Sequence, residues 1–198
     1  MEKRKEELKA LQAMMNPHFL YNCLSSIKWK AIRSEQDEIA DITGLLAKFY
    51  RTALNNGKQI TIVQNELENV KAYLQIQLKS HENSFEVIYN LSEEGRECRM
   101  PNFLLQPIVE NAIFYGLEPK NGERNLNIKA YCTEKKLIIK VEDNGVGMSF
   151  DKLRTINDAM SNGVSIGDNG RGTQLGIVNV NERLRLLYGE EFGLRIFS

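Results

Sequence analysis

The sequence predicts an α+β fold in which an N-terminal helical hairpin precedes an α/β sandwich domain. Apolar residues recur at helical spacing through residues 1–80, whereas alternating segments typical of strands begin near residue 85. Glycine-rich stretches then interrupt the second half of the chain. We therefore expect two domains, residues 1–82 and residues 83–198.

The composition argues against several classes of function. Lys plus Arg equals Asp plus Glu at 26 each, so the formal net charge is zero and no nucleic-acid partner is expected. The 3 cysteines are scattered and form no CxxC pair, which indicates a reducing compartment and no metal cluster. No apolar run is long enough for a membrane span, so we expect a soluble, intracellular chain.

The first two helices each carry an apolar stripe. The first stripe shifts at Pro17, from Leu8, Leu11 and Met15 to Leu20, Leu24, Ile27 and Ala31. The second stripe comprises Ile39, Ile42, Leu45 or Leu46, Phe49 and Ala53, and Gly57 is suited to the helix end. The short link "RSEQDE" makes the pair an antiparallel hairpin. Because a lone hairpin cannot bury both stripes, we expect a homodimer built as a four-helix bundle.

The remaining elements follow in order. A third helix is expected at residues 64–80, with Leu67, Val70, Leu74 and Leu78 on one side. Strands are expected at residues 85–91, 126–133, 136–142 and from 192 onward. Further helices are expected at residues 100–117, despite an internal proline, and at 174–189. Residues 143–172 are rich in glycine and predict a long loop.

Three segments of the second domain could bind a nucleotide. In "VEDNGVGM", Asp143 can accept a hydrogen bond from an exocyclic amine, while Gly145 and Gly147 let the backbone approach a flat ring. In "QPIVENAIFYGL", Asn111 offers a neutral oxygen ligand to a phosphate-bound Mg²⁺, with Glu110 beside it. The segment "GRGTQLGIVNVNERL" runs from glycines into a helix start, which can cradle phosphates. Taken alone, each segment is also explained by ordinary turn, amphipathic-helix or capping chemistry.

In this order the three segments resemble the Bergerat ATP-binding fold of histidine kinases, DNA gyrase, Hsp90-type chaperones and MutL, over roughly residues 85–198. The resemblance implies Mg²⁺ held through the phosphates by Asn111, with Glu110 as a second candidate. It implies ATP contacts from Asn111, Tyr115, Asp143, Gly145, Gly147, Gly172, Thr173, Leu175 and Gly176. Members that hydrolyse ATP with water carry a glutamate four residues before the helix asparagine. Pro107 stands there in this chain, so the phosphoryl acceptor is expected to be a group of the protein.

His18 is the candidate acceptor. Through "NPHFLYN" and "LLQPIVENA", nearly the whole chain resembles the catalytic core of a LytS-type sensor histidine kinase. The resemblance implies that His18 takes a phosphoryl group from ATP and that an aspartate of a response regulator receives it. It also implies a C-terminally truncated, cytoplasmic portion of a bacterial membrane protein.

The residues around His18 suggest how it works. An unperturbed histidine titrates near neutral pH, so a ring nitrogen is available for attack. Asn22, four residues later, lies on the same helix face and is a candidate for a phosphatase role. We expect Pro17 to distort the helix and turn His18 out of the bundle seam. The general base for His18 is not identified, since no acidic residue follows it.

The chain departs from this family at the phosphate end of the site. Phe114 and Tyr115 replace the usual basic pair, and Arg171, Lys120 or Arg124 are candidate substitutes. Gln174 stands where the family has its middle glycine. Two alternatives therefore stay open: a dimeric pseudokinase that binds nucleotide weakly, and a Bergerat-fold ATPase, which Pro107 disfavours.

Overall fold

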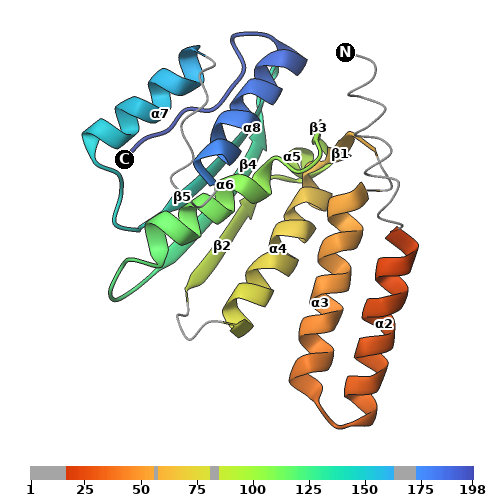
Figure 1. Ribbon diagram of the computed structural model, residues 1–198. Coiled ribbons are helices and arrows are strands. Elements are labelled where there is room, and N and C mark those ends of the chain that lie inside the picture. The colour runs from red at the N-terminus through yellow and green to blue at the C-terminus, as the bar shows by residue number, and fades with distance from the viewer. Residues whose placement is uncertain (1–16, 56–57, 81–84, 163–172) are drawn as a thin grey trace.

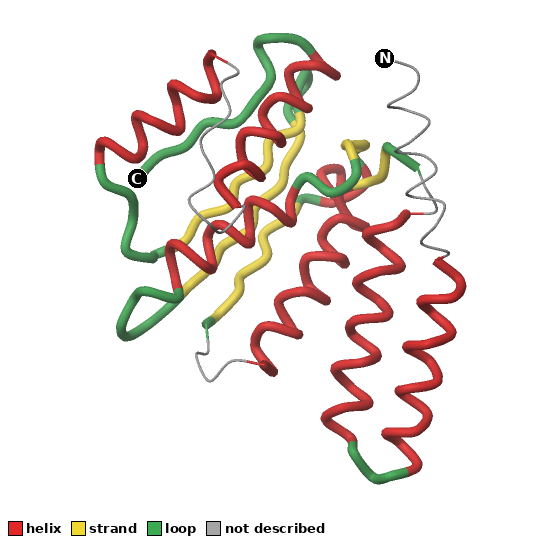
Figure 2. Tube along the Cα trace, viewed as in Figure 1, coloured by secondary structure: helices red, strands yellow, loops and turns green. Residues whose placement is uncertain are grey.

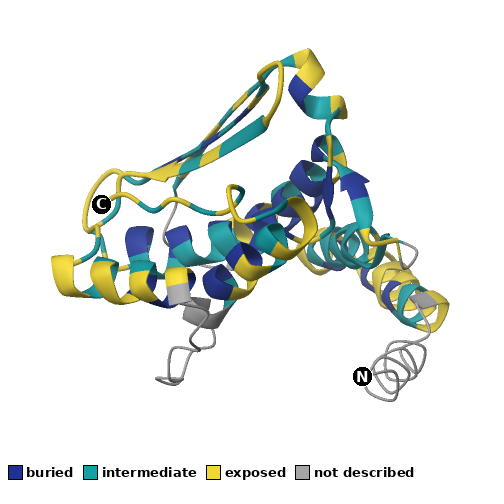
Figure 3. Ribbon diagram, turned by 90° about the horizontal axis from the view of Figure 1, so that it is seen from above, coloured by how far each residue is buried: buried dark blue, intermediate teal, exposed yellow. Residues whose placement is uncertain are grey.

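The computed structural model describes residues 17–55, 58–80, 85–162 and 173–198 (Figure 1). A helical hairpin leads through a central helix into a three-stranded sheet covered by helices on one face. In Figure 3 the strands form one layer and the helices the other. This arrangement confirms the predicted α+β fold. Among the helices described, none has the length and apolar character to cross a membrane.

Helices α2 (Pro17–Arg33) and α3 (Asp37–Leu54) form the predicted antiparallel hairpin. Of the first predicted stripe, Leu24 and Ala31 are buried. No member of the second predicted stripe is buried, and the buried residues of α3 are instead Ala40 and Thr43. Ile27 and Ile39, both expected in a stripe, are each 49% exposed. Phe19, Trp29 and Ile32 are exposed as well, so the hairpin presents apolar surface to its surroundings. The earlier seam positions Leu8, Leu11 and Met15 lie outside the residues described.

Helix α3 ends at an asparagine. Asn55 adopts the left-handed conformation (φ 41°) at the C-terminal cap, which asparagine tolerates better than most residues. Gly57, the stop expected from the sequence, lies outside the described chain.

Helix α4 (Val63–Ser80) is the central helix and packs between α3 and the helices of the α/β layer. Leu67, Val70 and Leu74 are buried as predicted, and Leu78 is partly exposed.

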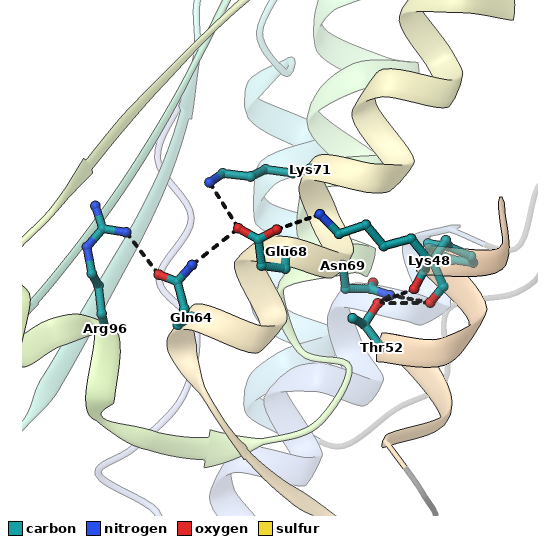
Figure 4. Close-up of polar contacts among 8 residues, drawn as sticks. Lys48, Thr52, Gln64, Glu68, Asn69, Lys71 and Arg96 are labelled. Carbon is teal, nitrogen blue, oxygen red and sulfur yellow. Dashed lines mark hydrogen bonds and ion pairs between the residues drawn. The ribbon is translucent and has the colours of Figure 1, made fainter. Parts of the chain in front are cut away.

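Polar contacts join α4 to its neighbours (Figure 4). The Lys48 ammonium lies 2.6 Å from the Glu68 carboxylate, and the Nδ2 of buried Asn69 donates to the Phe49 carbonyl (2.9 Å) and to Thr52 (2.8 Å). On the other side, Arg96 of the short helix α5 (Glu93–Glu97) donates to Gln64.

The sheet has the order β2 (Glu86–Leu91), β4 (Asn125–Cys132), β5 (Leu137–Asp143). Strand β4 runs parallel to β2 and antiparallel to β5. The segments expected as strands at residues 126–133 and 136–142 are therefore neighbours in the sheet. Leu126, Ile128 and Ala130 alternate into the core along β4. A separate two-stranded sheet pairs β1 (Ile60–Ile62) with β3 (Arg99–Pro101), and neither strand was predicted.

The prediction of one helix over residues 100–117 was wrong. Met100 and Pro101 belong to β3, and the helix begins only at Leu105. It then changes type, from the α-helix α6 (Leu105–Asn111) to the π-helix η2 (Ala112–Leu117). Pro107 is the third residue of α6, where a missing N–H leaves no helical hydrogen bond unmade.

Two further predictions in the C-terminal half were wrong. The expected loop 143–172 contains the helix α7 (Phe150–Asn162), whose Ile156, Ala159 and Met160 pack on Ile177 and Val178 of α8 (Thr173–Tyr188). The expected strand from residue 192 is a loop, which Figure 2 shows in green. It is held by a side chain, because the Leu194 amide donates to the Asn181 Oδ1 (2.9 Å).

The cysteines are less scattered in space than in the sequence. The sulfur atoms of Cys98, directly before β3, and of Cys132, at the end of β4, lie next to each other, with Cα atoms 7.6 Å apart. Cys23 is a free thiol on α2.

Candidate functional site

The histidine of the "NPHFLYN" segment lies on an exposed part of α2. The Nδ2 of Asn22, one turn later, lies 3.3 Å from the Nδ1 of His18, so the two side chains share a helix face as predicted. When the amide donates, Nδ1 is the acceptor, and the contact sets the orientation of the imidazole. His18 is exposed. The expected distortion of the helix at Pro17 involves residues before Pro17, which lie outside the described chain.

A second group of predicted residues meets at the end of β5, where Asp143 is exposed. The Gly145 N–H donates to the Asp143 Oδ1 (2.9 Å), which fixes the turn that follows the strand. Gly147 has φ +70°, a conformation that favours glycine. The other Asp143 oxygen remains available for an amine of a ligand.

Gly116 of the π-helix packs directly against this turn. A Cβ on Gly145 would lie 2.3 Å from the Gly116 backbone, and a Cβ on Gly116 would lie 2.5 Å from the Asp143 Oδ1. The Val146 N–H also donates to the Gly116 carbonyl (3.0 Å). Backbone therefore meets backbone beside a carboxylate, and neither glycine could carry a side chain without a shift of the other segment.

The predicted residues Asn111 and Tyr115 lie where the α-helix α6 changes into the π-helix η2. The Glu118 N–H bonds to the Ile113 carbonyl, a π-type spacing, so the turn is wider than in an α-helix. Asn111 is the last residue of α6, and Tyr115 and Gly116 follow it within η2. Glu110, beside Asn111, accepts a hydrogen bond from the buried Gln106 (2.7 Å). Asn111 offers an amide oxygen and Glu110 a carboxylate, which are oxygen ligands of the kind that Mg²⁺ accepts, although neighbouring residues of a helix point in different directions.

The third predicted segment is described in part. Gly172 lies outside the described chain, and Thr173 and Leu175 open α8, with side chains that the structure does not describe. Gly176 lies against α6, because a Cβ there would approach the Pro107 Cβ to 3.3 Å. Gly176 therefore brings α8 close to the helix that carries Asn111.

Comparison with known proteins adds a second line of argument. The family model of histidine kinases matches residues 6–85, and that of histidine kinase-, DNA gyrase B-, and HSP90-like ATPases matches residues 101–195. The sensor histidine kinase YesM of Bacillus subtilis is 37% identical over 195 residues, which cover 98% of this chain and 31% of the relative. The sensor protein LytS of Staphylococcus epidermidis is 31% identical, over 97% of this chain and 32% of its own length.

The chain belongs to the LytS-type sensor histidine kinases. Another relative, the sensor histidine kinase YpdA of Escherichia coli, is 34% identical over 96% of this chain. The chain spans about a third of the length of these curated relatives, 31% of YesM and 32% of LytS and YpdA.

In this LytS-type chain, the two candidate basic substitutes that the structure describes bind backbone. Lys120 donates to the Asn144 carbonyl (2.5 Å), and the Arg124 Nε donates to the Lys120 carbonyl (2.8 Å). Both side chains brace the loop after η2. Arg171, the third candidate, lies outside the residues described.

Sequence reasoning missed three residues that lie beside or support the predicted site. Gly116 was not singled out, although an isolated glycine within a helical pattern is a usable signal. Lys152 of α7 was hidden in a segment expected to be a loop, and its Nζ lies 4.4 Å from the centroid of the Tyr115 ring. Glu66 of α4 was assigned no role, yet its carboxylate accepts hydrogen bonds from the backbone N–H groups of Phe103, Leu104 and Leu105.

Glu66 anchors the start of the helix that carries Asn111. It is 4% exposed, and burial raises the pKa of its carboxyl although the three N–H donors and Arg183 oppose that shift. Phe103, one of the residues it holds, has a positive φ of 62°. The carboxylate thus stabilises an unfavourable turn and the first amides of α6 together.

Proposed function

We propose that this LytS-type chain is an ATP-dependent protein-histidine kinase that phosphorylates itself on His18 and passes the phosphoryl group to an aspartate of a response regulator. The observation that carries the proposal is the presence, in one chain, of an exposed histidine in contact with an amide and of the glycine turn that packs on Gly116 beside Asp143. Pro107 supports it, because the side chain at that position cannot activate water.

In the proposed reaction, Asp143 accepts a hydrogen bond from the exocyclic amine of adenine. Asn111 and Glu110 would hold Mg²⁺ through the phosphates, and the ion would neutralise charge on the transferring group. A ring nitrogen of His18 attacks the γ-phosphorus. The bond to the β-phosphate oxygen breaks, ADP leaves, and the ring proton passes to solvent.

The distance between the two parts of the site shapes this proposal. Helix α2 packs on α3, and α3 and α4 stand between it and the α6 helix (Figure 1). ATP bound beside Asp143 therefore reaches His18 in one of two ways. Either the helical hairpin moves relative to the α/β domain, or the histidine belongs to a second protomer. The exposed apolar residues of the hairpin support a homodimer formed through its helices.

We keep two expectations as parts of the same proposal. The first is the division into a dimerisation and phosphotransfer region (1–82) and an ATP-binding domain (83–198). The second is that the region works at the cytoplasmic side of a bacterial membrane, within a longer sensor. The relatives YesM and LytS are named as sensor proteins, which supports the second expectation.

Incubation with γ-labelled ATP and Mg²⁺ tests the kinase. We expect label on the protein that is acid-labile, base-stable and absent from His18→Gln. Nucleotide binding without labelling would favour the pseudokinase. Inorganic phosphate released without phosphoprotein would favour the ATPase.

The role of Asn22 has its own test. We propose that its amide orients water when the kinase dephosphorylates its partner, on the basis of its contact with His18. In Asn22→Ala we expect autophosphorylation to survive while phosphatase activity falls. An equal loss of both activities would contradict the phosphatase role of Asn22.

A further inference from the structure

The nucleotide site lacks the basic residues that this family usually places directly after the helix asparagine. Phe114 and Tyr115 occupy those positions. A triphosphate brings several negative charges, and phosphoryl transfer depends on stabilising them. Another cation in the fold is therefore required near η2.

We propose that Lys152, from the first turn of α7, contacts the phosphates of the bound nucleotide and replaces the missing basic pair. The proposal rests on the proposed ATP site and deepens it. The Lys152 Nζ lies 4.4 Å from the centroid of the Tyr115 ring. Tyr115 comes four residues after Asn111 and directly before Gly116, whose backbone meets the Asp143 turn. An ammonium group therefore sits above the helix that carries the predicted Mg²⁺ ligand.

Of the other candidate cations, the two that lie within the described residues are already engaged. Lys120 and Arg124 donate to the backbone carbonyls of Asn144 and Lys120, which secures the loop they belong to. Lys152 makes no ion pair with a carboxylate among the residues that the structure describes. Its recorded contact is with an aromatic face, which holds the cation without neutralising it.

The chemistry favours transfer of this lysine from the ring to a phosphate. A charge-assisted hydrogen bond from an ammonium to a phosphate oxygen is stronger than a cation–π contact at a partly exposed site. Lysine is suited to the role because its compact charge sits on a flexible stem and can follow the ligand. Tyr115 keeps the ammonium group close to the site before the nucleotide arrives.

The test compares ligands that differ only in phosphates. Calorimetric titration of Lys152→Met with ATP should show an affinity at least roughly tenfold below wild type, since a charge-assisted contact is lost. The affinity for adenosine should stay within about twofold, because the proposed contact is to phosphate alone. Lys135→Met removes the same charge from the exposed β4–β5 turn and should bind both ligands like wild type.

A rescue variant sharpens the result. Phe114→Lys, added to Lys152→Met, should restore part of the ATP affinity by returning a cation to the position where the family carries one. Chemical acetylation of the wild-type protein gives a reading that needs no variant. ATP should protect Lys152 from modification, and adenosine should not.

The outcomes separate this inference from the proposed function. ATP binding that is equal in wild type, Lys152→Met and Lys135→Met overturns the role of Lys152 and leaves the ATP site intact. An equal loss of ATP and adenosine affinity in Lys152→Met overturns it too, because the lysine would then support the site's structure. A wild-type chain that binds neither ligand overturns the proposed function and this inference together.

Discussion

The helix that runs from Leu105 to Leu117 meets a carboxylate at each end, and the two carboxylates are treated differently. At the N-terminal end, Glu66 is buried and accepts three backbone N–H groups, at 2.5, 2.9 and 3.1 Å. At the C-terminal end, Asp143 is exposed and, within the described part of the chain, accepts one, from Gly145 at 2.9 Å. The first carboxylate is satisfied by the protein, whereas the second keeps hydrogen-bonding capacity for a ligand.

The difference teaches how one helix serves stability and binding at once. Glu66 belongs to the central helix α4, so it ties the nucleotide helix to the core that also contacts the hairpin. Asp143 ends an edge strand, and its exposed carboxylate lies beside Gly116 of the π-helix. We therefore expect changes at Glu66 to cost folding free energy and changes at Asp143 to cost affinity.

The largest expected effect is at Glu66. Glu66→Ala should lower the free energy of unfolding by about 3 kcal/mol, because three backbone N–H groups lose their acceptor at about 1 to 3 kcal/mol each, partly offset by removal of a buried charge. Urea unfolding followed by circular dichroism measures the change. Glu68→Ala is the matched control on the same helix, since the partly exposed Glu68 pairs with Lys48 and Lys71 and accepts a hydrogen bond from the Gln64 side chain, but from no backbone N–H among the described residues. Equal losses in the two variants would contradict the anchoring role.

The next effect should appear in binding alone. Asp143→Asn should weaken binding of ATP and of adenosine at least about tenfold, or roughly 1.4 kcal/mol, because the amide is a poorer acceptor for the exocyclic amine. The unfolding midpoint should stay close to that of wild type. Glu142→Gln, at the neighbouring residue, removes a carboxylate that pairs with Lys129 and should leave both affinities unchanged. An Asp143→Asn protein that binds adenosine normally would remove Asp143 from the site.

The third effect is a pH dependence that belongs to Glu66. Burial raises the pKa of this carboxyl above its ordinary value near 4.5, so the folded state holds the proton more tightly than the unfolded state. Its contribution to stability is therefore fully present below the unfolded pKa and falls as pH rises through the folded pKa.

Comparison with Glu66→Gln isolates that dependence. Glu68 and Glu142 have pKa values lowered mainly by hydrogen bonds from Lys48 and Lys129, so their contributions are lost as pH falls. Both are common to wild type and variant and cancel in the difference. The wild-type advantage in unfolding free energy should decrease as pH rises from 4.5. A difference that does not change with pH would show that Glu66 does not titrate differently on folding.

The smallest effect concerns the ion pair between α3 and α4. The side chains of Lys48 and Glu68 are 38% and 30% exposed, so water screens their attraction. A double-mutant cycle with Lys48→Ala and Glu68→Ala should give a coupling energy below about 1 kcal/mol. A coupling as large as the loss at Glu66 would mean that exposed polar contacts, too, anchor the nucleotide helix.

Local patterns predicted much of this molecule. The stripe on α4 and the alternation along β4 depend only on the period of one element, and both were recovered. Helix α7 was missed, although Ile156, Ala159 and Met160 carry a helical spacing that could have revealed it. The break between β3 and α6 had no comparable local signal. Met100 and Pro101 extend because they pair with β1, which lies some forty residues earlier in the chain.

The sequence by itself determined the chemistry that this chain can offer: a histidine with an amide one turn away, an asparagine helix, and a carboxylate before a glycine turn. The covalent chain fixes which groups are present and how many residues separate them, whatever the tertiary structure is. Only the tertiary structure decided which of them meet. It set Gly116 under Gly145, Glu66 under the start of α6, and Lys152 over Tyr115. These contacts join distant segments through close approach in space, and no periodicity along the chain encodes which distant residues come together.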